Sequence, residues 1–481
     1  MSALLWTSDA MVKAMRAVTQ GALPEGVTGL SIDSRTIAPG EAYFAIKGDV
    51  HDGHSFVAAA LKAGAGLAVV EAAQRAKFPA DAPLLVVDDV LAGLVELAHA
   101  SRARLINTQI IAITGSVGKT STKEALRRVL SAQGETHAST ASFNNHWGVP
   151  LSLARCPAGA RFAVFEIGMN HAGEITPLIR MVRPHVAVIT TVEPVHLEFF
   201  AGIEAIADAK AEIFLGVEPG GAVVLNRDNS QFARLQRRAK KAGISRIVSF
   251  GTNGRSDARL IDLSLHATCS AVHADILDHD ITYKIGMPGR HMAMNSLAVL
   301  AAASLLGADI ARAALSLAQL EAPSGRGVRR TLEVGHGEAT LIDESYNANP
   351  ASMGAALNVL GQAPVGPHGR RIAVLGDMLE LGPTAPELHR GLIEAVAANR
   401  IDLVYCCGPL MRNLWDALST GKRGGYAESS AALEAQAVAA IRTGDAIMVK
   451  GSLGSKMKVI VSALEKRFPD KAAHEEAVQD F

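Results

Sequence analysis

The chain has 481 residues, of which 47 are Lys or Arg and 47 are Asp or Glu, so its formal net charge is zero. This length exceeds one compact core and predicts about three domains of roughly 150 residues each. The balanced charge gives no support for binding nucleic acid through bulk charge. Hydrophobic residues make up 49% of the chain and aromatic residues only 4%, a composition typical of buried parallel sheets flanked by helices.

Signals for export, membrane insertion and cross-linking are not found in the sequence. The first 15 residues include Asp9 and no sustained apolar segment, which does not fit a secretory signal. The most apolar stretch, at residues 298–306, is too short to cross a bilayer. The four cysteines have neither metal-site nor disulfide spacing. We therefore expect a cytoplasmic, monomeric protein without membrane insertion and without a nucleic-acid partner.

The apolar runs form three groups, which predict α/β domains at residues 1–106, 107–322 and 323–481. The first group predicts a small α/β domain. In the other two groups strands alternate with helical stretches, which predicts a mainly parallel, doubly wound central sheet and a Rossmann-like C-terminal domain. A Gly- and Pro-rich segment at residues 322–327 marks the second boundary. Strands are predicted at residues 43–46, 67–70, 84–87, 110–113, 163–167, 186–190, 223–225, 247–250, 340–342, 372–375, 403–406 and 446–449, and a buried helix at residues 292–306.

The strongest local signal is a glycine-rich loop between the run at residues 110–113 and a helical stretch at residues 121–130. Its sequence is Thr114-Gly115-Ser116-Val117-Gly118-Lys119-Thr120, followed by Ser121. A strand, a glycine turn and a helix N-terminus together bind phosphates, the lysine can reach the β- and γ-phosphates, and the threonine can bind Mg²⁺. Position 113 is Ile where the general motif begins with glycine, so the loop is a shortened variant. It predicts nucleotide binding without separating kinase, GTPase, ATPase and ligase.

Three further residues are candidates for the site, and two of them lie near strand ends, where such a sheet gathers its ligands. Glu166 lies near the end of the predicted strand 163–167, where a carboxylate can bind Mg²⁺ or remain solvated, and the spacing favours neither. His196 follows the next predicted strand, and a lone histidine is usually structural. Lys210 lies on a predicted helix at residues 205–215, where a single lysine is usually a solvated surface residue.

Several motifs together resemble those of the Mur ligase family, over nearly the whole chain. The glycine-rich loop is similar to the family's Thr-Gly-Ser/Thr-x-Gly-Lys-Thr sequence, and residues 143–150 (FNNHWGVP) are similar to its Asn-Asn-x-x-Gly-x-Pro sequence. Further matches are residues 166–169 (EIGM), 195–198 (VHLE), 209–212 (AKAE), Arg326 and residues 343–350 (DESYNANP). Residues 345–350, 374–382 (VLGDMLELG) and 450–452 (KGS) resemble the branch of the family that adds D-alanyl-D-alanine, and residues 32–35 (IDSR) and 48–54 resemble its uridine-nucleotide site.

The resemblance implies an ATP-dependent ligase that activates a carboxylate as an acyl-phosphate and joins it to an amine. The first domain would bind a UDP-N-acetylmuramoyl-tripeptide, the central domain ATP, and the third domain the incoming D-alanyl-D-alanine while closing on ATP. The implied cofactors are ATP, two Mg²⁺ ions and a CO₂-derived carbamate on Lys210. Catalytic roles are implied for Lys119, Glu166, His196 and Lys210, and metal binding for Thr120, Glu166, His196 and Lys210. ATP contacts are implied for residues 114–121, Asn295, Arg326, Asp343, Tyr346 and Asn347, and substrate contacts for Ile32, Ser34, Arg35, Asn144, Asn145, Lys450 and Ser452.

One departure from the family and two alternative functions remain. Met292 follows Gly289-Arg290-His291 where the family often has Asn, although Asn295 is present. The first alternative is the diamino-acid-adding ligase of the same family, which should lack the sequences at residues 345–350 and 374–382. The second is a P-loop regulatory ATPase that forms no ligated product. The third residue of the tripeptide stays open between diaminopimelate and lysine.

Overall fold

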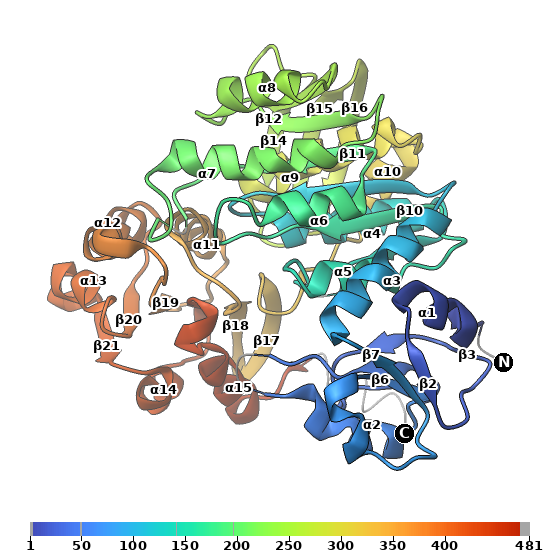
Figure 1. Cartoon of the computed structure of the whole chain (residues 1–481). Coiled ribbons are helices and arrows are strands. Elements are labelled where there is room, and N and C mark those ends of the chain that lie inside the picture. Colours follow the sequence, from blue (N-terminus) through green and yellow to red (C-terminus); the bar gives the residue numbers. More distant parts are fainter. Residues whose placement is uncertain (1–2, 49–50, 141, 196, 472–481) are drawn as a thin grey trace, which may run out of the picture.

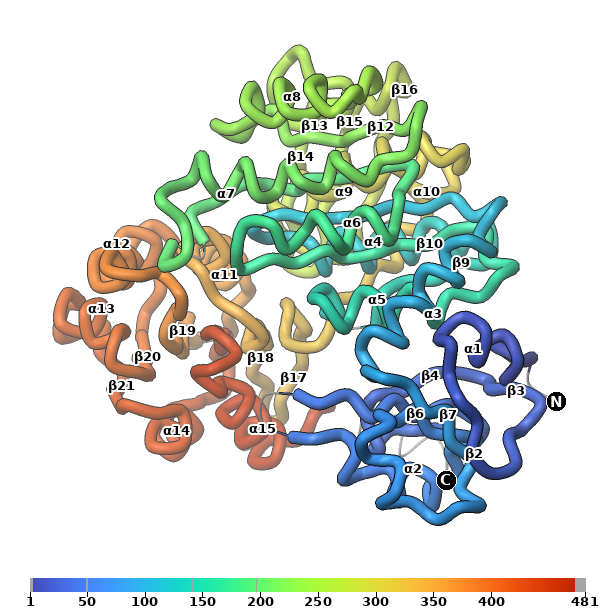
Figure 2. The backbone as a smooth tube through the Cα atoms, in the orientation of Figure 1, coloured from blue at the N-terminus to red at the C-terminus, as the bar shows by residue number. Residues whose placement is uncertain are grey.

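The computed structural model describes residues 3–48, 51–140, 142–195 and 197–471, and its strands form three main sheets. The sheets belong to three lobes that follow one another along the chain (Figures 1 and 2). In both views the N-terminal lobe lies at the lower right, the central lobe at the top and the C-terminal lobe at the lower left. The predicted three-domain α/β architecture is confirmed. Within the described residues no helix combines the length and apolar character needed to cross a membrane.

The N-terminal lobe contains seven short strands and three α-helices: β1 (Trp6–Thr7), β2 (Val18–Gln20), β3 (Gly26–Val27), β4 (Leu30–Ser31), β5 (Ala42–Phe44), β6 (Leu67–Glu71), β7 (Leu84–Val87), α1 (Ser8–Met15), α2 (Val57–Lys62) and α3 (Val90–Arg104). Its main sheet has the order β2-β7-β6-β5-β4 and is parallel except at β2. Helix α3 ties this lobe to the central one. The hydroxyl of Ser101 donates to the Leu153 carbonyl at 2.7 Å, and Arg104 donates to the carbonyls of Leu5 and Cys156.

The central lobe is built on nine strands: β8 (Gln109–Thr114), β9 (Thr136–Ala138), β10 (Phe162–Glu166), β11 (Val186–Ile189), β12 (Ala222–Asn226), β13 (Arg246–Gly251), β14 (Ala258–Leu265), β15 (Ser270–Ile276) and β16 (His279–Ile285). They form one sheet in the order β16-β15-β14-β13-β12-β11-β8-β10-β9. The sheet is parallel from β9 to β14, as predicted, and its last two strands are antiparallel. Strands β14 to β16, at residues 258–285, were not predicted. The alternating burial of β15 is the period-two pattern that marks it.

Seven helices cover the two faces of this sheet: α4 (Lys119–Ser131), α5 (Gly148–Ala154), α6 (Ile175–Val182), α7 (Ile203–Lys210), α8 (Phe232–Lys241), α9 (Arg290–Leu305) and α10 (Ile310–Leu317). Residues of α4, α9 and α10 share one hydrophobic core with the strands. Residues of α5, α6, α7 and α8 share the core on the opposite face. The predicted buried helix at residues 292–306 is α9, whose alanine-rich sequence permits close packing on both sides.

The C-terminal lobe has six strands and five α-helices: β17 (Val328–Val334), β18 (Gly337–Glu344), β19 (Arg371–Gly376), β20 (Leu403–Cys407), β21 (Arg423–Ala427), β22 (Ala446–Lys450), α11 (Pro350–Gln362), α12 (Ala385–Ala398), α13 (Arg412–Ala417), α14 (Ser430–Ala439) and α15 (Lys458–Arg467). The sheet order is β17-β18-β22-β19-β20-β21, parallel except for the hairpin β17–β18.

Ligands of open α/β sheets bind beyond the carboxyl ends of the strands. In the central sheet these ends belong to β8, β10 and β11, which are neighbours.

Candidate active site

The glycine-rich loop joins β8 directly to α4, which begins at Lys119. A β-carbon built on Gly115 would lie 1.9 Å from the Thr190 hydroxyl oxygen, a distance no side chain tolerates. Gly118 has a φ of 85°, in the left-handed region that favours glycine. The loop therefore depends on glycine at both positions. Its backbone N–H groups lie at the N-terminus of α4, where anions are favoured.

The segment that follows β11 holds the glycine-rich loop in place through hydrogen bonds. The Ser116 hydroxyl makes two hydrogen bonds with the backbone of Glu193. It donates to the Glu193 carbonyl at 3.0 Å and accepts from the Glu193 N–H at 2.9 Å. The Thr190 hydroxyl donates to the Val117 carbonyl at 2.5 Å. Thus Ser116 and Val117 anchor the loop to the protein, and Thr190 and Glu193 are site residues that the sequence analysis missed. Their position just after a neighbouring parallel strand is the signal that could have identified them.

Lys119 is half-buried, and its ammonium donates to the Gly115 carbonyl at 2.7 Å. Burial lowers the pKa of this amine, and the positive charge of Arg326 lowers it further. The carboxylate of Glu166 acts in the opposite direction. The lysine thus lies near one anion, Glu166, and one further cation, Arg326, at the start of α4.

Glu166 ends β10 and is 1% exposed, so the structure excludes a solvated strand-end acid. One carboxylate oxygen accepts a hydrogen bond from the Thr120 hydroxyl at 2.9 Å, and the other accepts from the side-chain amide of Asn144 at 2.8 Å. The predicted residues Thr120, Asn144 and Glu166 therefore lie together. Asn145 instead accepts from the Gly148 N–H at 2.9 Å and stabilises the start of α5.

Lys210 is the last residue of α7 and is 2% exposed, so the structure also excludes the solvated surface position that is usual for lysine. Burial lowers the pKa of its amine well below 10.5, and the charge of Lys119 lowers it further. Burial disfavours the protonated form of an amine, and the unprotonated form is the one that acts as a nucleophile. His196, predicted beside it, lies outside the described residues.

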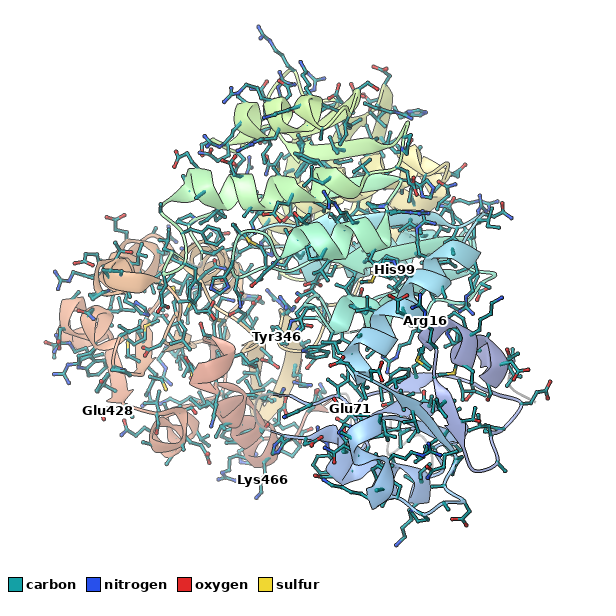
Figure 3. All side chains as sticks on the ribbon, in the orientation of Figure 1. Arg16, Glu71, His99, Tyr346, Glu428 and Lys466 are labelled. Carbon is teal, nitrogen blue, oxygen red and sulfur yellow. The ribbon has the colours of Figure 1, made fainter. Side chains whose placement is uncertain are left out.

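The C-terminal lobe contributes Arg326 and Tyr346 to the same region. The guanidinium of Arg326 lies 4.1 Å from the centre of the Tyr346 ring and donates to the Ser142 hydroxyl of the central lobe at 3.3 Å. Figure 3 shows Tyr346 near the middle of the view, between the three lobes. Asn295, on α9 of the central lobe, lies beside Gly118 of the glycine-rich loop. Arg326 therefore joins two lobes at the edge that carries the loop.

The other predicted residues of this lobe stabilise its strand ends. Asp343, at 1% exposure, accepts from the Ser345 hydroxyl at 2.6 Å and pairs with the Lys458 ammonium at 3.0 Å. Lys450 donates to the Glu344 carboxylate at 3.2 Å and to the Asn347 carbonyl at 2.9 Å. The Ser452 hydroxyl accepts from the Leu379 N–H at 2.9 Å and donates to the Ala348 carbonyl at 3.3 Å. Glu344 lies within the predicted segment at residues 343–350, whereas Lys458 was not predicted, because only its pairing with Asp343 in the fold reveals it.

The predicted nucleotide-binding segment of the N-terminal lobe forms a turn after β4. Asp33 accepts hydrogen bonds from the Arg35 backbone and guanidinium at 2.7–2.9 Å, which lower the pKa of Asp33 to about 2. The Arg35 side chain is 85% exposed. Ile32 and Ser34 are half-buried, and Ile32 packs against the core of this lobe. The turn thus holds an exposed guanidinium whose Nε and Nη2 are bonded to the Asp33 carboxylate.

Family models match all three lobes. The model described as "Mur ligase family, catalytic domain" matches residues 26–105, "Mur ligase middle domain" matches residues 113–303, and "Mur ligase, glutamate ligase domain" matches residues 329–453.

Known proteins match along nearly the whole chain. A UDP-N-acetylmuramoyl-tripeptide–D-alanyl-D-alanine ligase from Rickettsia prowazekii is 31% identical over 435 residues, covering 90% of this chain and 94% of the relative. A crystal structure of MurF from Acinetobacter baumannii superimposes with a TM-score of 0.81 at 28% identity, covering 96% and 99% of the two chains. MurF from Thermotoga maritima in complex with ADP gives a TM-score of 0.74 at 25% identity, covering 91% and 97%. With the phosphate loop, the buried Glu166 and the arginine bridge between lobes in place, these matches show that the chain belongs to the Mur ligase family of ATP-dependent ligases.

Proposed function

We propose that this ligase uses ATP to add D-alanyl-D-alanine to a UDP-N-acetylmuramoyl-tripeptide, a step of peptidoglycan precursor synthesis. The observation that carries the proposal is the convergence of Lys119, Glu166 and Lys210 beside the glycine-rich loop. A phosphate loop next to a buried carboxylate suits metal-assisted phosphoryl transfer. The relative from Rickettsia prowazekii bears this activity in its name and matches 90% of the chain.

The first step activates the carboxylate. A carboxylate oxygen of the tripeptide attacks the γ-phosphorus of ATP, the bond to the β–γ bridging oxygen breaks, and ADP leaves. Both reactants are anionic, so the ammonium of Lys119 and the guanidinium of Arg326 would stabilise the charge that gathers around the phosphorus. The N–H groups of the glycine-rich loop would orient the phosphates.

The second step forms the amide. The free amine of D-alanyl-D-alanine attacks the acyl carbon, the amine loses a proton, and the tetrahedral intermediate expels phosphate. Water competes with this amine for the acyl-phosphate, so the site must exclude water before the amine arrives. Arg326 links the C-terminal and central lobes at this point, which supports a role for lobe closure in excluding water.

The donor atoms at the site fit Mg²⁺. The Thr120 hydroxyl and the Glu166 carboxylate are hard oxygen donors 2.9 Å apart. Across the part of the chain that the structure describes, no three His, Cys, Asp or Glu side chains form a metal site by themselves. The proposed set therefore includes Thr120, His196 and a modified Lys210 in addition to Glu166. When bound, Mg²⁺ would neutralise charge on the phosphates.

We also propose that Lys210 is carbamylated. Its neutral nitrogen would form a bond to the carbon of CO₂ and release one proton, giving a carbamate with two oxygen donors. An unmodified ammonium would repel Mg²⁺, whereas a carbamate would attract it. The burial of Lys210 at 2% exposure and its lowered pKa support this modification, because only the unprotonated amine reacts with CO₂.

The proposal can be tested by phosphate release with a panel of substrates, followed by mass spectrometry of the product. Release that requires both UDP-tripeptide and D-alanyl-D-alanine, with a product increased by the mass of the dipeptide less water, is expected. Tripeptides ending in diaminopimelate and in lysine are compared to define the donor. Product formed from a UDP-dipeptide and a free diamino acid would identify the other branch of the family. Release without either substrate would identify a regulatory ATPase.

Replacement of Arg326 by alanine is expected to raise the KM for ATP by about tenfold. The variant loses one charge-assisted contact to ATP, and such a contact contributes about 1.5–3 kcal/mol. Initial rates at varied ATP measure the change. Arg412→Ala is the matched control, since Arg412 also lies over a tyrosine ring of the same lobe, at 5.0 Å from Tyr426. Equal KM values for ATP in both variants and the parent would contradict the role of Arg326.

Replacement of Ser34 or Arg35 by alanine is expected to weaken binding of the UDP-substrate by about tenfold and to leave ATP affinity unchanged. The reason is that this turn lies in the N-terminal lobe, whereas the glycine-rich loop lies in the central lobe. Calorimetric titration with each ligand measures the two affinities separately. A parallel loss for both ligands would indicate global damage and would contradict a local role of the turn.

A further inference from the structure

Two carboxylates flank Lys210 in the sequence, and both point away from it in the fold. Asp208 lies two residues before Lys210 and Glu212 two residues after it, in the short 3₁₀ helix at Ala211–Gly216. Residues four apart share a helix face, and a residue midway between them lies about 200° around the axis. Accordingly Lys210 is buried, whereas Asp208 and Glu212 are only partly buried. The same stretch of chain thus has one face toward Lys119 and another toward neighbouring helices.

Asp208 is held by two arginines of α8. Arg234 donates from Nε and Nη2 to the two carboxylate oxygens, both at 2.9 Å. Arg238 donates from Nε at 2.9 Å and approaches through Nη2 at 2.7 Å. These contacts hold the pKa of Asp208 far below its usual range. Bidentate geometry and a three-residue network distinguish this contact from an ordinary surface ion pair.

Glu212 is held by the first residues around α6. Its carboxylate accepts from the Gly173 N–H at 2.6 Å, from the Thr176 N–H at 3.0 Å and from the Thr176 hydroxyl at 2.8 Å. A carboxylate is favoured at this place, because free N–H groups and the positive end of the helix dipole meet there. The segment that leads into α6 begins directly after Glu166. Glu212 therefore connects the helix of Lys210 to the strand end that carries Glu166.

The other contacts of helix α7 are apolar and not directional. It has eight residues, and its N-cap, Gly202, makes no side-chain capping hydrogen bond. Its buried residues Ile206, Ala207 and Ala209 share one hydrophobic core with Ile213 and Phe214 of the 3₁₀ helix that follows. Short helices gain their stability from tertiary contacts. The two carboxylates provide the directional part of those contacts.

We propose that Asp208 and Glu212 are positioning residues that hold Lys210 in its buried place near Lys119, where its amine can be carbamylated. The inference rests on the proposed carbamylation and goes beyond it, by assigning the burial of Lys210 to two polar anchors on different neighbouring helices. Losing one anchor removes the hydrogen bonds that fix one side of α7, so the Lys210 side chain is held less firmly where a carbamate would form. The bicarbonate requirement of the enzyme should therefore increase, while ATP binding at the glycine-rich loop is retained.

The test compares Asp208→Asn and Glu212→Gln with the parent in buffers freed of CO₂ and then supplied with ¹³C-bicarbonate. Asp416→Asn is the matched control, because Asp416 pairs with Arg412 on the exposed helix α13. We expect each anchor variant to need about fivefold more bicarbonate for half-maximal ligation, with kcat largely restored at saturation and KM for ATP unchanged. The carbamate signal in ¹³C NMR should fall at limiting bicarbonate, and hydrogen exchange in residues 203–216 should become faster.

Controls separate this inference from the proposed function. Asp208→Glu retains the charge and should recover most of the parental bicarbonate response, and thermal unfolding establishes that each variant is folded. A carbamate signal in the parent that is unchanged in both anchor variants would overturn the positioning role while leaving carbamylation intact. A parent without any carbamate signal and without a bicarbonate response would overturn both.

Discussion

Replacement of Lys119 by alanine is expected to lower kcat by about 100-fold or more, because it removes a preorganised positive charge at the site of phosphoryl transfer. The ammonium is half-buried and bonded to the Gly115 carbonyl, so it is fixed in place before ATP binds. Rates of phosphate release with both substrates measure the loss. A variant with near-parental turnover would contradict the assignment of the phosphate loop.

Lys119→Met separates charge from packing. Methionine retains most of the side-chain volume but has no charge, so this variant should be as inactive as the alanine variant. Its thermal stability should equal or exceed that of the parent, since a buried amine pays for desolvation that methionine avoids. The lowered pKa of Lys119 reports that desolvation. A large loss of thermal stability in Lys119→Met would show that the lysine is needed for folding and not only for catalysis.

Replacement of Lys210 by alanine is expected to abolish ligation almost completely, and added formate or acetate is expected to restore part of it. The small anions can enter the space left by the side chain and supply the oxygen donors that a carbamate would provide. Lys210→Arg should stay inactive, because guanidinium keeps a positive charge and does not react with CO₂. Parental activity in Lys210→Ala would rule out the carbamate, and activity of Lys210→Arg would show that a cation suffices.

The pH dependence of stability gives an independent measurement on Lys210. In CO₂-free buffer the folded state releases this proton at lower pH than the unfolded chain, whose lysine keeps its ordinary pKa of 10.5. Between those two values the unfolded state binds more protons, so the stability of the parent rises with pH. Lys210→Met lacks this dependence. The Tm of Lys210→Met should therefore exceed the Tm of the parent most at the lowest pH, and the difference should shrink as the pH approaches 10.5. A difference in Tm that stays constant with pH would show that Lys210 titrates normally.

The sequence alone identified the phosphate loop and most of the strands near it. These features depend on neighbours in the chain: Gly115 and Gly118 permit the turn, and the apolar run before them is β8. The antiparallel strands β14–β16 were not predicted, although the alternation in β15 is visible. Each of these strands is buried on one face only, so its mean apolar content is lower than that of the fully buried parallel strands.

For individual side chains the sequence left open whether they are buried or solvated, and tertiary contacts decided this. Spacing did not tell whether Glu166 is a solvated acid or whether Lys210 is a surface lysine. The structure buries both and pairs Glu166 with Thr120, 46 positions earlier. Burial depends on which elements cover a residue, and this is set by the packing of segments distant in the sequence.

By itself, therefore, the sequence determined the three-lobe α/β organisation, the phosphate loop and the resemblance to the Mur ligases, because hydrophobic periodicity and contiguous motifs are local properties. Only the tertiary structure decided the burial that lowers the pKa of Lys210, the hydrogen bonds of Asp208 and Glu212, and the bridge from Arg326 to Ser142 across 184 positions. The physical reason is that desolvation and ion pairing act through space, over distances that the order of residues does not specify.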